Sequence, residues 1–194
     1  MPDRSRPILV LYATREGHTR RIAEHIAATI RARGHFSDVL DAAHLPAGFS
    51  LANYTAVMVA ASVHQGAHEK EMVSFVRSHR ADLEGMPSVF LSVSLSEAGA
   101  EDPAASPERR ARSAADVQKM IDQFLAETGW HPSKIRAVAG ALSYTKYNFL
   151  VRFVMKRIAK SQGASTDTSH DHDLTDWEAL DRLVDEVVPG PASS

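Results

Sequence analysis

Four short runs of the sequence are apolar at almost every position, and they limit the fold more than any other feature. These runs cover residues 8–12, 57–62, 88–93 and 135–140, and a weaker one lies at 37–40. A strand without polar alternation must be covered on both faces, as the strands of parallel sheets are. Helical patterns separate the runs, so we expect a doubly wound α/β fold with five parallel strands and right-handed crossovers.

The spacing of apolar residues and the capping residues predict the helices. Isoleucines recur every four residues from position 22 to 30, and Gly34 ends that helix. Ser106 followed by Pro107 is typical of a helix start. The tetrapeptide that begins at Thr175, Thr-Asp-Trp-Glu, is a capping box with Thr175 as the cap. Further helices are therefore expected over residues 68–79, 107–127 and 177–188.

Length and composition restrict the class of protein. A chain of 194 residues is most simply one domain over residues 1–194, with loose tails at 1–6 and 189–194. Its 22 basic and 24 acidic residues leave a net charge of −2, which argues against nucleic acid as a partner. The absence of cysteine excludes disulfides, thiolate metal sites and cysteine nucleophiles. No signal peptide or membrane span is recognisable, so a cytoplasmic location is expected.

The turn between the first apolar run and the first helix is suited to a phosphate. Ligands of open parallel sheets bind at the carboxyl ends of strands, where the next helix N-terminus attracts anions. Gly17 permits close backbone approach, and Thr14 and Thr19 can donate hydroxyl hydrogen bonds. The P-loop lysine and the dinucleotide-binding glycines are missing, so a single terminal phosphate fits best. A helix cap without a ligand is the simpler alternative.

Two more loops are expected at the same edge of the sheet. Residues 61–66, Ala-Ser-Val-His-Gln-Gly, follow the third strand, and residues 92–95, Ser-Val-Ser-Leu, follow the fourth. Both are small and polar, and their backbone groups could hold the two flanks of a flat ring. Neither loop contains an aromatic residue to stack on such a ring, which either leaves room for a flat substrate or indicates a different function.

Together, the motifs Thr-x-x-Gly-x-Thr, Ala-Ser-x-x-x-Gly and Ser-Val-x-Leu resemble the three FMN-binding loops of a flavodoxin domain. From residue 8 to the last helix, the chain more narrowly resembles the bacterial quinone-dependent protoporphyrinogen oxidase family. The more specific matches are Ala-Gly-Ala-Leu at 139–142 and Thr-Asp-Trp-Glu at 175–178. Others are Met-Pro-Ser at 86–88, Arg-Phe at 152–153 and Thr-Asp-Thr at 166–168.

This resemblance implies a flavodoxin-like sheet of strand order 2-1-3-4-5 that binds FMN. It also implies oxidation of protoporphyrinogen IX to protoporphyrin IX in heme biosynthesis, with a membrane quinone as electron acceptor. The flavin would carry the chemistry, so no catalytic side chain and no metal is assigned. The cofactor-binding residues implied are Thr14, Arg15, Glu16, Gly17, His18 and Thr19 for the phosphate, and Ala61, Ser62, Val63, His64, Gln65, Gly66, Ser92, Val93, Ser94 and Leu95 for the ring.

Two alternatives to this function stay open. One is a flavodoxin-type electron-transfer protein with protein partners, and the other is a flavodoxin-fold protein that binds FMN weakly or not at all. The near-neutral charge argues against the first, because carriers with cationic partners should be acidic. The intact glycine and hydroxyl positions of the three loops argue against the second.

A basic insertion over residues 141–165 follows the fifth strand. Residues 146–160 hold five basic residues and no acidic one, whereas residues 166–186 hold eight carboxylates. On a helix the basic side chains would share one arc, namely Arg152, Lys156, Arg157 and Lys160. Such a helix could lie on an anionic membrane surface at the inner face of the cell membrane, or bind the propionates of a porphyrinogen. An ordinary surface helix facing the acidic stretch is the alternative.

Several other residues are candidates for binding or for packing. The run at 170–173, His-Asp-His-Asp, has metal-ligand types, but we expect a solvated loop because no supporting ligand follows at helical spacing. His64 and His68 are four apart and either are satisfied surface residues or face each other or the flavin. Trp130 and Trp177 are expected to pack against the sheet.

Overall fold

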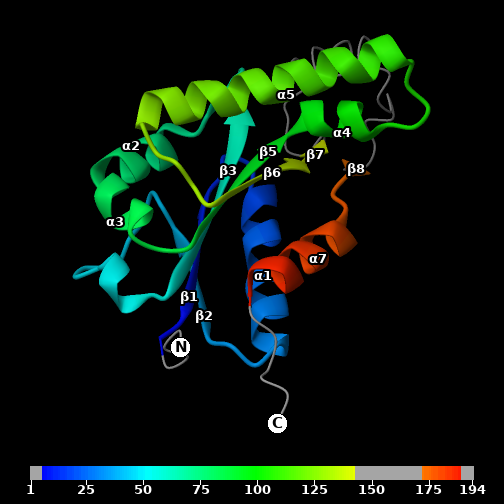
Figure 1. Cartoon of the computed structure of the whole chain (residues 1–194). Coiled ribbons are helices and arrows are strands. Elements are labelled where there is room, and N and C mark those ends of the chain that lie inside the picture. The colour runs from blue at the N-terminus through cyan, green and yellow to red at the C-terminus, as the bar shows by residue number, and fades with distance from the viewer. Residues whose placement is uncertain (1–5, 143–171, 189–194) are drawn as a thin grey trace.

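The computed structural model describes residues 6–142 and 172–188 of the chain, and its main feature is a parallel sheet (Figure 1). The parallel strands are β1 (Ile8–Ala13), β2 (Ser37–Asp41), β3 (Ala56–His64), β5 (Ser88–Ser94) and β6 (Lys134–Ala139). They lie in the order β2-β1-β3-β5-β6. This is the predicted order 2-1-3-4-5, and the direction of winding reverses between β1 and β3. Ligands of such sheets bind at that switch point.

The carboxyl ends of the strands finish at one edge of the sheet. Ala13 pairs with Ala61, at the end of β1 and within β3. Farther along the same edge Ser62 pairs with Val93, and Ser94 pairs with Ala139. The three loops identified in the sequence therefore start from one edge, as expected.

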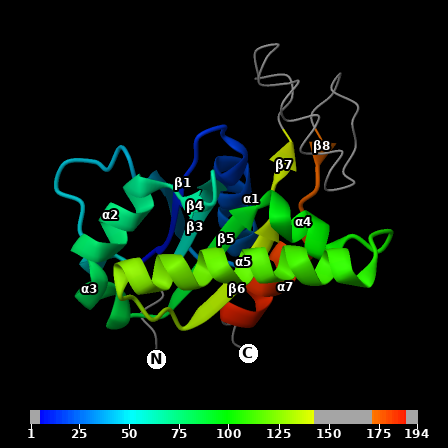
Figure 2. The same ribbon diagram turned by 90° about the horizontal axis from the view of Figure 1, so that it is seen from above.

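Helices cover both faces of the sheet. One face carries α2 (Lys70–Ser78), α3 (Arg80–Glu84) and α5 (Pro107–Thr128), and the other carries α1 (His18–Ala32) and α7 (Trp177–Val187). Seen from above, α5 runs along one side of the sheet and α1 lies on the other (Figure 2). Leu9 and Leu11 of β1 pack toward α5, whereas Val10 packs toward α1, and all three are fully buried. This two-sided burial explains why the strands lack polar alternation.

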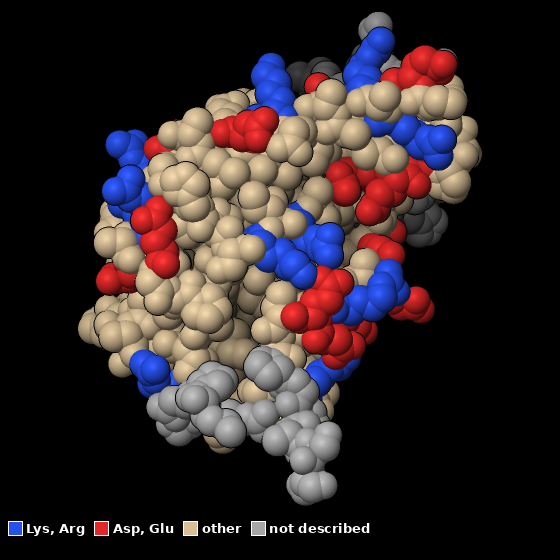
Figure 3. All heavy atoms as spheres, viewed as in Figure 1, with Lys and Arg blue, Asp and Glu red and all other residues tan. Residues whose placement is uncertain are grey.

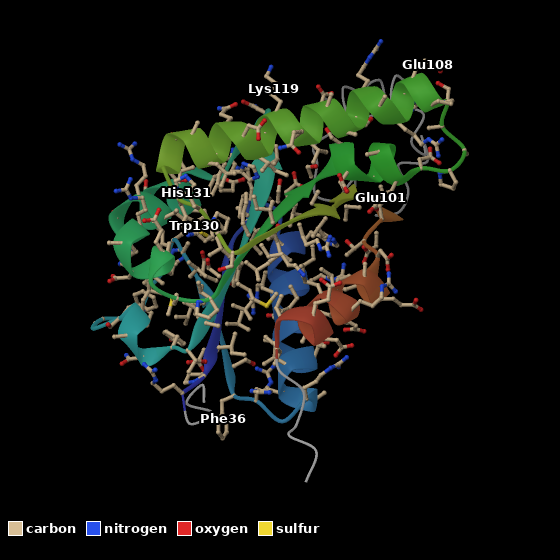
Figure 4. The ribbon with its side chains drawn as sticks, viewed as in Figure 1. Phe36, Glu101, Glu108, Lys119, Trp130 and His131 are labelled. Atoms are coloured by element: carbon tan, nitrogen blue, oxygen red, sulfur yellow. The ribbon has the colours of Figure 1, made fainter. Side chains whose placement is uncertain are left out.

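Trp130 packs against the sheet as predicted, whereas the ring of Trp177 meets His18 and His25 of α1. Trp130, at the end of α5, is fully buried and meets Phe90 of β5 edge-on, with the ring centroids 6.0 Å apart (Figure 4). Trp177 begins α7 and packs against the core on the other face. The helix cap beside it differs from the prediction. The carboxylate of Asp176 accepts from the backbone N–H of Ala179 (2.9 Å), so Asp176 and not Thr175 caps α7.

Several short elements were not predicted. The helix expected over residues 68–79 is observed as α2, but the short helix α3 that follows His79 was not predicted. The two-residue strand β4 (Ala67–His68) pairs antiparallel with β3, and α4 (Leu95–Glu101) starts directly after β5. A 3-10 turn, η1 (Leu51–Asn53), precedes β3. The two loops expected after β3 and β5 are thus a hairpin and a helix start.

Residues 143–165 of the basic insertion lie outside the described residues, as do its Arg152, Lys156, Arg157 and Lys160, so its predicted helix stays a prediction. The chain on either side of it forms the antiparallel pair β7 (Ala141–Leu142) and β8 (His172–Asp173), which lie side by side (Figure 2). Of the predicted N-terminal tail only Arg6 is described, and its guanidinium donates to the carbonyl of Ala52 (2.8 Å). Among the described residues, no helix is both long enough and apolar enough to cross a membrane.

Candidate cofactor site

The turn between β1 and α1 is held in shape by its own hydrogen bond. The backbone N–H of Gly17 donates to the hydroxyl oxygen of Thr14 at 3.0 Å. Gly17 has a φ of 90°, in the left-handed region that favours glycine. Helix α1 therefore begins at His18, and the first backbone N–H groups of a helix have no partner within it. Together with the helix dipole, these groups form a site suited to an anion.

Thr19 provides an observation on whether this turn fits a phosphate. It lies in the first turn of α1 and is fully buried, yet its hydroxyl has no hydrogen-bond partner among the described residues. Buried polar groups in proteins are nearly always paired, and an unpaired one calls for an explanation. A phosphate oxygen at the turn would accept from this hydroxyl. The residues of the turn therefore fit a phosphate group.

A buried carboxylate ties this turn to the end of β3. Glu69, directly before α2, is only 6% exposed, and one of its oxygens accepts from the guanidinium of Arg15 at 3.3 Å. Its other oxygen lies 3.3 Å from the hydroxyl of Ser62. That hydroxyl also lies 3.4 Å from the carbonyl of Ala13. Arg15 and Ser62, predicted from separate loops, are thus brought together, and Glu69 is the residue that the sequence reasoning missed.

The loop predicted over residues 61–66 is the tip of a β-hairpin. Val63 pairs with His68, and His64 pairs with Ala67, so only two residues turn the chain. Gln65 and Gly66 have φ values of 51° and 83°, as a two-residue hairpin of the primed type requires. The hairpin extends β3 beyond the sheet and places its tip beside the start of α4.

The loop predicted over residues 92–95 is the passage from β5 into α4. Ser94 caps α4, because its hydroxyl oxygen accepts from the backbone N–H of Glu97 (3.2 Å). The spacing Ser-x-x-Glu in this segment is that of a capping box, so the sequence did contain a signal for α4. Ser92 is fully buried, and its hydroxyl lies 2.9 Å from Nε2 of His68.

A groove of about 540 Å³ lies between the hairpin, the start of α4 and α5. Its volume is typical of a small-molecule site. Five predicted ring-binding residues line it: Val63, Gln65, Gly66, Ser94 and Leu95. The sequence reasoning missed the contribution of α5, which comes from Asp116, Lys119, Met120 and Gln123. The side chain of Lys119 extends from α5 in Figure 4. The side chains of Ala61 and Val93, also predicted at the ring, are buried in the core.

His68 is neither a surface residue nor a partner of His64, and both expectations for it are wrong. Its side chain is buried beneath the hairpin against the stacked rings of Phe90 and Phe124, whose centroids lie 5.2 and 4.9 Å from that of its imidazole. Burial lowers the pKa of His68 to about 4, so the imidazole is neutral at physiological pH. Its role here is to tie the hairpin to β5 through Ser92.

His18 is a predicted phosphate residue whose ring attaches α1 to the C-terminal part of the chain. Its Nε2 lies 2.7 Å from the hydroxyl of Thr175, and both side chains are buried. The ring also meets Trp177 edge-on, at a centroid distance of 6.1 Å. What His18 can offer an anion at the turn is therefore its backbone N–H.

The described residues contain no group of side chains that could hold a metal ion. Of the run at 170–173, the first two residues lie outside the described part, and His172 and Asp173 form β8 instead of a loop. A carboxylate oxygen of Asp173 accepts from the guanidinium of Arg21 (3.3 Å), and the other accepts from the backbone N–H of Thr175 (3.1 Å).

A second groove, of about 370 Å³, lies between α4, β6 and α7. Glu97 and Glu101 line it. Burial raises the pKa of both carboxyls. The nearby charge of Glu101 raises the pKa of Glu97 further, and that of Asp176 raises the pKa of Glu101 further. Lys134 and Arg136 of β6 both pair with Glu186 of α7. Acidic and basic side chains accordingly alternate over this face, without a patch of one sign (Figure 3).

Comparisons with known proteins identify the family of this chain. The family model described as a flavodoxin domain matches residues 9–169. The protoporphyrinogen IX dehydrogenase (quinone) of Escherichia coli strain K12 is 33% identical over 180 residues, which cover 93% of each chain. The protein of the same name from Leishmania major is 30% identical over 195 residues, 98% of this chain and 78% of the relative.

Solved structures support the fold alone. The oxidised flavodoxin 1 of Bacillus cereus superposes with a TM-score of 0.51 at 18% identity, covering 94% of this chain and 97% of that one. A short-chain flavodoxin associated with a bacterial microcompartment gives a TM-score of 0.52 at 13% identity, with the same coverage. The flavodoxin domain implies flavin binding. The chain belongs to the flavodoxin domain family and, within it, to the quinone-dependent protoporphyrinogen IX dehydrogenases.

Proposed function

We propose that this protein binds FMN and oxidises protoporphyrinogen IX to protoporphyrin IX, with a quinone as electron acceptor. The two named relatives, at 30–33% identity over most of the chain, support this substrate and acceptor. The observation that carries the cofactor assignment is the buried, unpaired hydroxyl of Thr19 in the first turn of α1. When bound, FMN would supply the redox chemistry by accepting a hydride equivalent at its ring.

The residues of the chain would bind and orient the two ends of the cofactor. The N–H groups of the first turn of α1 and the hydroxyl of Thr19 would hold the phosphate. The groove between the hairpin and α4 would take the ring, with Gln65 and Leu95 on its rim. Among the residues that the structure describes, no aromatic side chain lines this groove, so none of them would stack on the ring. We infer that a flat, ring-shaped substrate could approach that open face.

The proposal includes contact with a membrane surface, where a quinone dissolves. This part rests on the sequence alone, since Arg152, Lys156, Arg157 and Lys160 lie outside the described residues. Each basic residue near an anionic surface contributes about 1 kcal/mol to binding. The double variant Lys156→Glu, Arg157→Glu should therefore lose binding to anionic vesicles in a sedimentation assay. Lys119→Glu is a control within the described fold, and equal loss in both variants would contradict a specific role for the basic segment.

Two measurements test the function. Purified protein titrated with FMN should quench flavin fluorescence to saturation and become yellow. The loaded protein should then form fluorescent protoporphyrin IX from protoporphyrinogen IX, at a rate that depends on added quinone under anaerobic conditions. FMN binding without porphyrin formation would instead favour an electron-transfer protein, and no FMN binding would leave only a flavodoxin fold without its cofactor.

A further inference from the structure

A chain of buried hydrogen bonds joins the start of α1 to the end of β6. The hydroxyl of Thr175 lies 2.8 Å from the carbonyl oxygen of Ala139 and donates its proton there. The same hydroxyl oxygen is 2.7 Å from Nε2 of His18. Because a hydroxyl has one proton, the bond to His18 must be donated by the ring. His18 therefore carries a proton on Nε2, and Thr175 is both acceptor and donor.

Thr175 has no role as a helix cap, although its sequence context suggests one. Asp176 caps α7, and Thr175 lies 8% exposed between α1 and β6. Its backbone N–H donates to Asp173, which also accepts from Arg21 one turn along α1 from His18. The guanidinium of Arg21 in turn lies 5.7 Å from the centre of the Trp177 ring. Residues 173–177 thus hold the first two turns of α1 by several contacts.

The first turn of α1 is the part of the site where position matters most. His18 is the first residue of α1, directly after Gly17 and directly before Thr19, whose buried hydroxyl is unpaired among the described residues. A hydrogen bond that fixes the ring of His18 also fixes the direction of this turn. Binding groups need to be held within a fraction of an ångström to be effective, and neighbouring residues supply that restraint.

The same network also reaches the ring groove. The backbone N–H of Gly140, which follows Ala139, donates to the carbonyl of Ser94 (3.0 Å). The N–H of Leu174 donates to the carbonyl of Gly140 (3.3 Å). The segment around Thr175 is therefore bonded both to the phosphate turn and to the strand end at the groove. These hydrogen bonds fix the position of the phosphate turn relative to the strand end at the groove.

We propose that Thr175 is a positioning residue for cofactor binding, which acts through the Nε2–H of His18 on the phosphate turn. The proposal rests on the proposed FMN binding. Thr175 does not itself touch the cofactor. It orients the N–H groups and the Thr19 hydroxyl, which would touch the phosphate. It should therefore affect the binding of the phosphate and not that of the ring.

A comparison of FMN with riboflavin tests this division, because riboflavin lacks the phosphate. Thr175→Val keeps the branched shape but removes both hydrogen bonds. Thr175→Val should lower the affinity for FMN about tenfold, measured by flavin fluorescence quenching, and leave the affinity for riboflavin unchanged. Thr175→Ser restores the hydroxyl and should bind FMN within about twofold of wild type.

Thr128→Val is the matched control. Thr128 is also a buried threonine whose hydroxyl donates to a carbonyl, that of Phe124 at 2.8 Å, but it lies at the far end of α5. This variant should keep the wild-type ratio of FMN to riboflavin affinity even if it is less stable. If Thr175→Val fails to fold, His18→Phe keeps a ring against Trp177 without the Nε2 donor and should show the same selective loss.

The outcomes separate this inference from the function on which it rests. A wild-type ratio of FMN to riboflavin affinity in folded Thr175→Val, or in His18→Phe when the first does not fold, would overturn the role of Thr175 alone. Equal weakening of both ligands would also overturn it, because it would show a general structural effect. Failure of wild-type protein to bind FMN would overturn the proposed function together with this inference.

Discussion

The guanidinium of Arg15 and the carboxylate of Glu69 meet at 3.3 Å, where the phosphate turn faces the residue that precedes α2. Glu69 is buried and Arg15 is 54% exposed, so the positive charge lies on the outer side of the pair. A buried carboxylate without a counter-ion is costly. Arg15 therefore neutralises a negative charge that would otherwise repel a phosphate at the turn.

This pairing predicts a compensating effect between two substitutions. Arg15→Ala should weaken FMN about tenfold, roughly 1.4 kcal/mol, because the carboxylate of Glu69 is left uncompensated beside the phosphate. Adding Glu69→Gln should recover much of that loss, since the repelling charge is then absent. Isothermal titration calorimetry with FMN measures the affinities of the wild type, the two single variants and the double variant. Strictly additive losses in the double variant would contradict the account of Glu69 as a charge that Arg15 masks.

Thr19→Val should separate stability from function. Replacing an unpaired buried hydroxyl by a methyl group is expected to be neutral for the apoprotein or to stabilise it by about 1 kcal/mol. FMN affinity should nevertheless fall about tenfold, because the phosphate loses a donor. Chemical denaturation of the apoprotein and FMN titration measure the two effects.

Thr29→Val on the same helix serves as the control for Thr19. Its hydroxyl donates to the carboxylate of Asp181 at 2.7 Å, and this bond is the main reason why the pKa of that carboxyl is lowered. Its loss should destabilise the protein by about 1.5 kcal/mol without a change in the preference for FMN over riboflavin. Unchanged FMN binding in Thr19→Val would rule out the assignment of this hydroxyl to the phosphate.

Gly66→Ala should destabilise the hairpin through its backbone alone. Gly66 has a φ of 83°, and a methyl group placed on its Cα would meet no atom within 4 Å. The cost of placing alanine in that conformation is about 1 kcal/mol. Gly85, whose φ lies outside the left-handed region, offers a control in which alanine should cost less. Equal stability of Gly66→Ala and wild type in urea denaturation would refute the hairpin geometry.

The buried imidazole of His68 makes stability depend on pH. Its pKa is about 4 in the folded protein and about 6.5 in the unfolded chain, so acid protonates the unfolded state first. The contribution to stability is complete above about pH 6.5 and is lost as the pH falls toward about 4. Between pH 7 and pH 5 the wild type should lose about 2 kcal/mol more than His68→Gln, measured by urea denaturation. Parallel pH profiles for the two proteins would show that His68 is exposed to solvent.

The strands could be predicted from the sequence because burial on both faces of a sheet makes each of them a continuous apolar run, whereas their order was implied by the resemblance to a flavodoxin domain. An apolar run such as residues 57–62 is visible without tertiary information, and the helices between the runs force parallel pairing. The observed ends of the main strands lie within two residues of the predicted ones, as β3 at Ala56–His64 illustrates.

The details of the site were less accessible because they depend on contacts far apart in the chain. Gln65 adopts a positive φ that its side chain does not favour, and only pairing of β4 with β3 reveals the turn. His68 looks polar in sequence but is buried against two stacked phenylalanines that lie 22 and 56 residues later in the numbering. Thr175 matched a capping box, yet its hydroxyl bonds across 36 residues to Ala139 and leaves the cap to Asp176.

The central claim is that the edge of the sheet binds FMN and uses it to oxidise a porphyrinogen. Its most direct test is anaerobic turnover of protoporphyrinogen IX by the FMN-loaded protein, followed by porphyrin fluorescence with and without a quinone. We expect porphyrin formation that requires both FMN and the quinone and that falls in parallel with FMN occupancy in Thr19→Val. FMN-saturated protein that forms no porphyrin above the rate of free FMN would contradict the account.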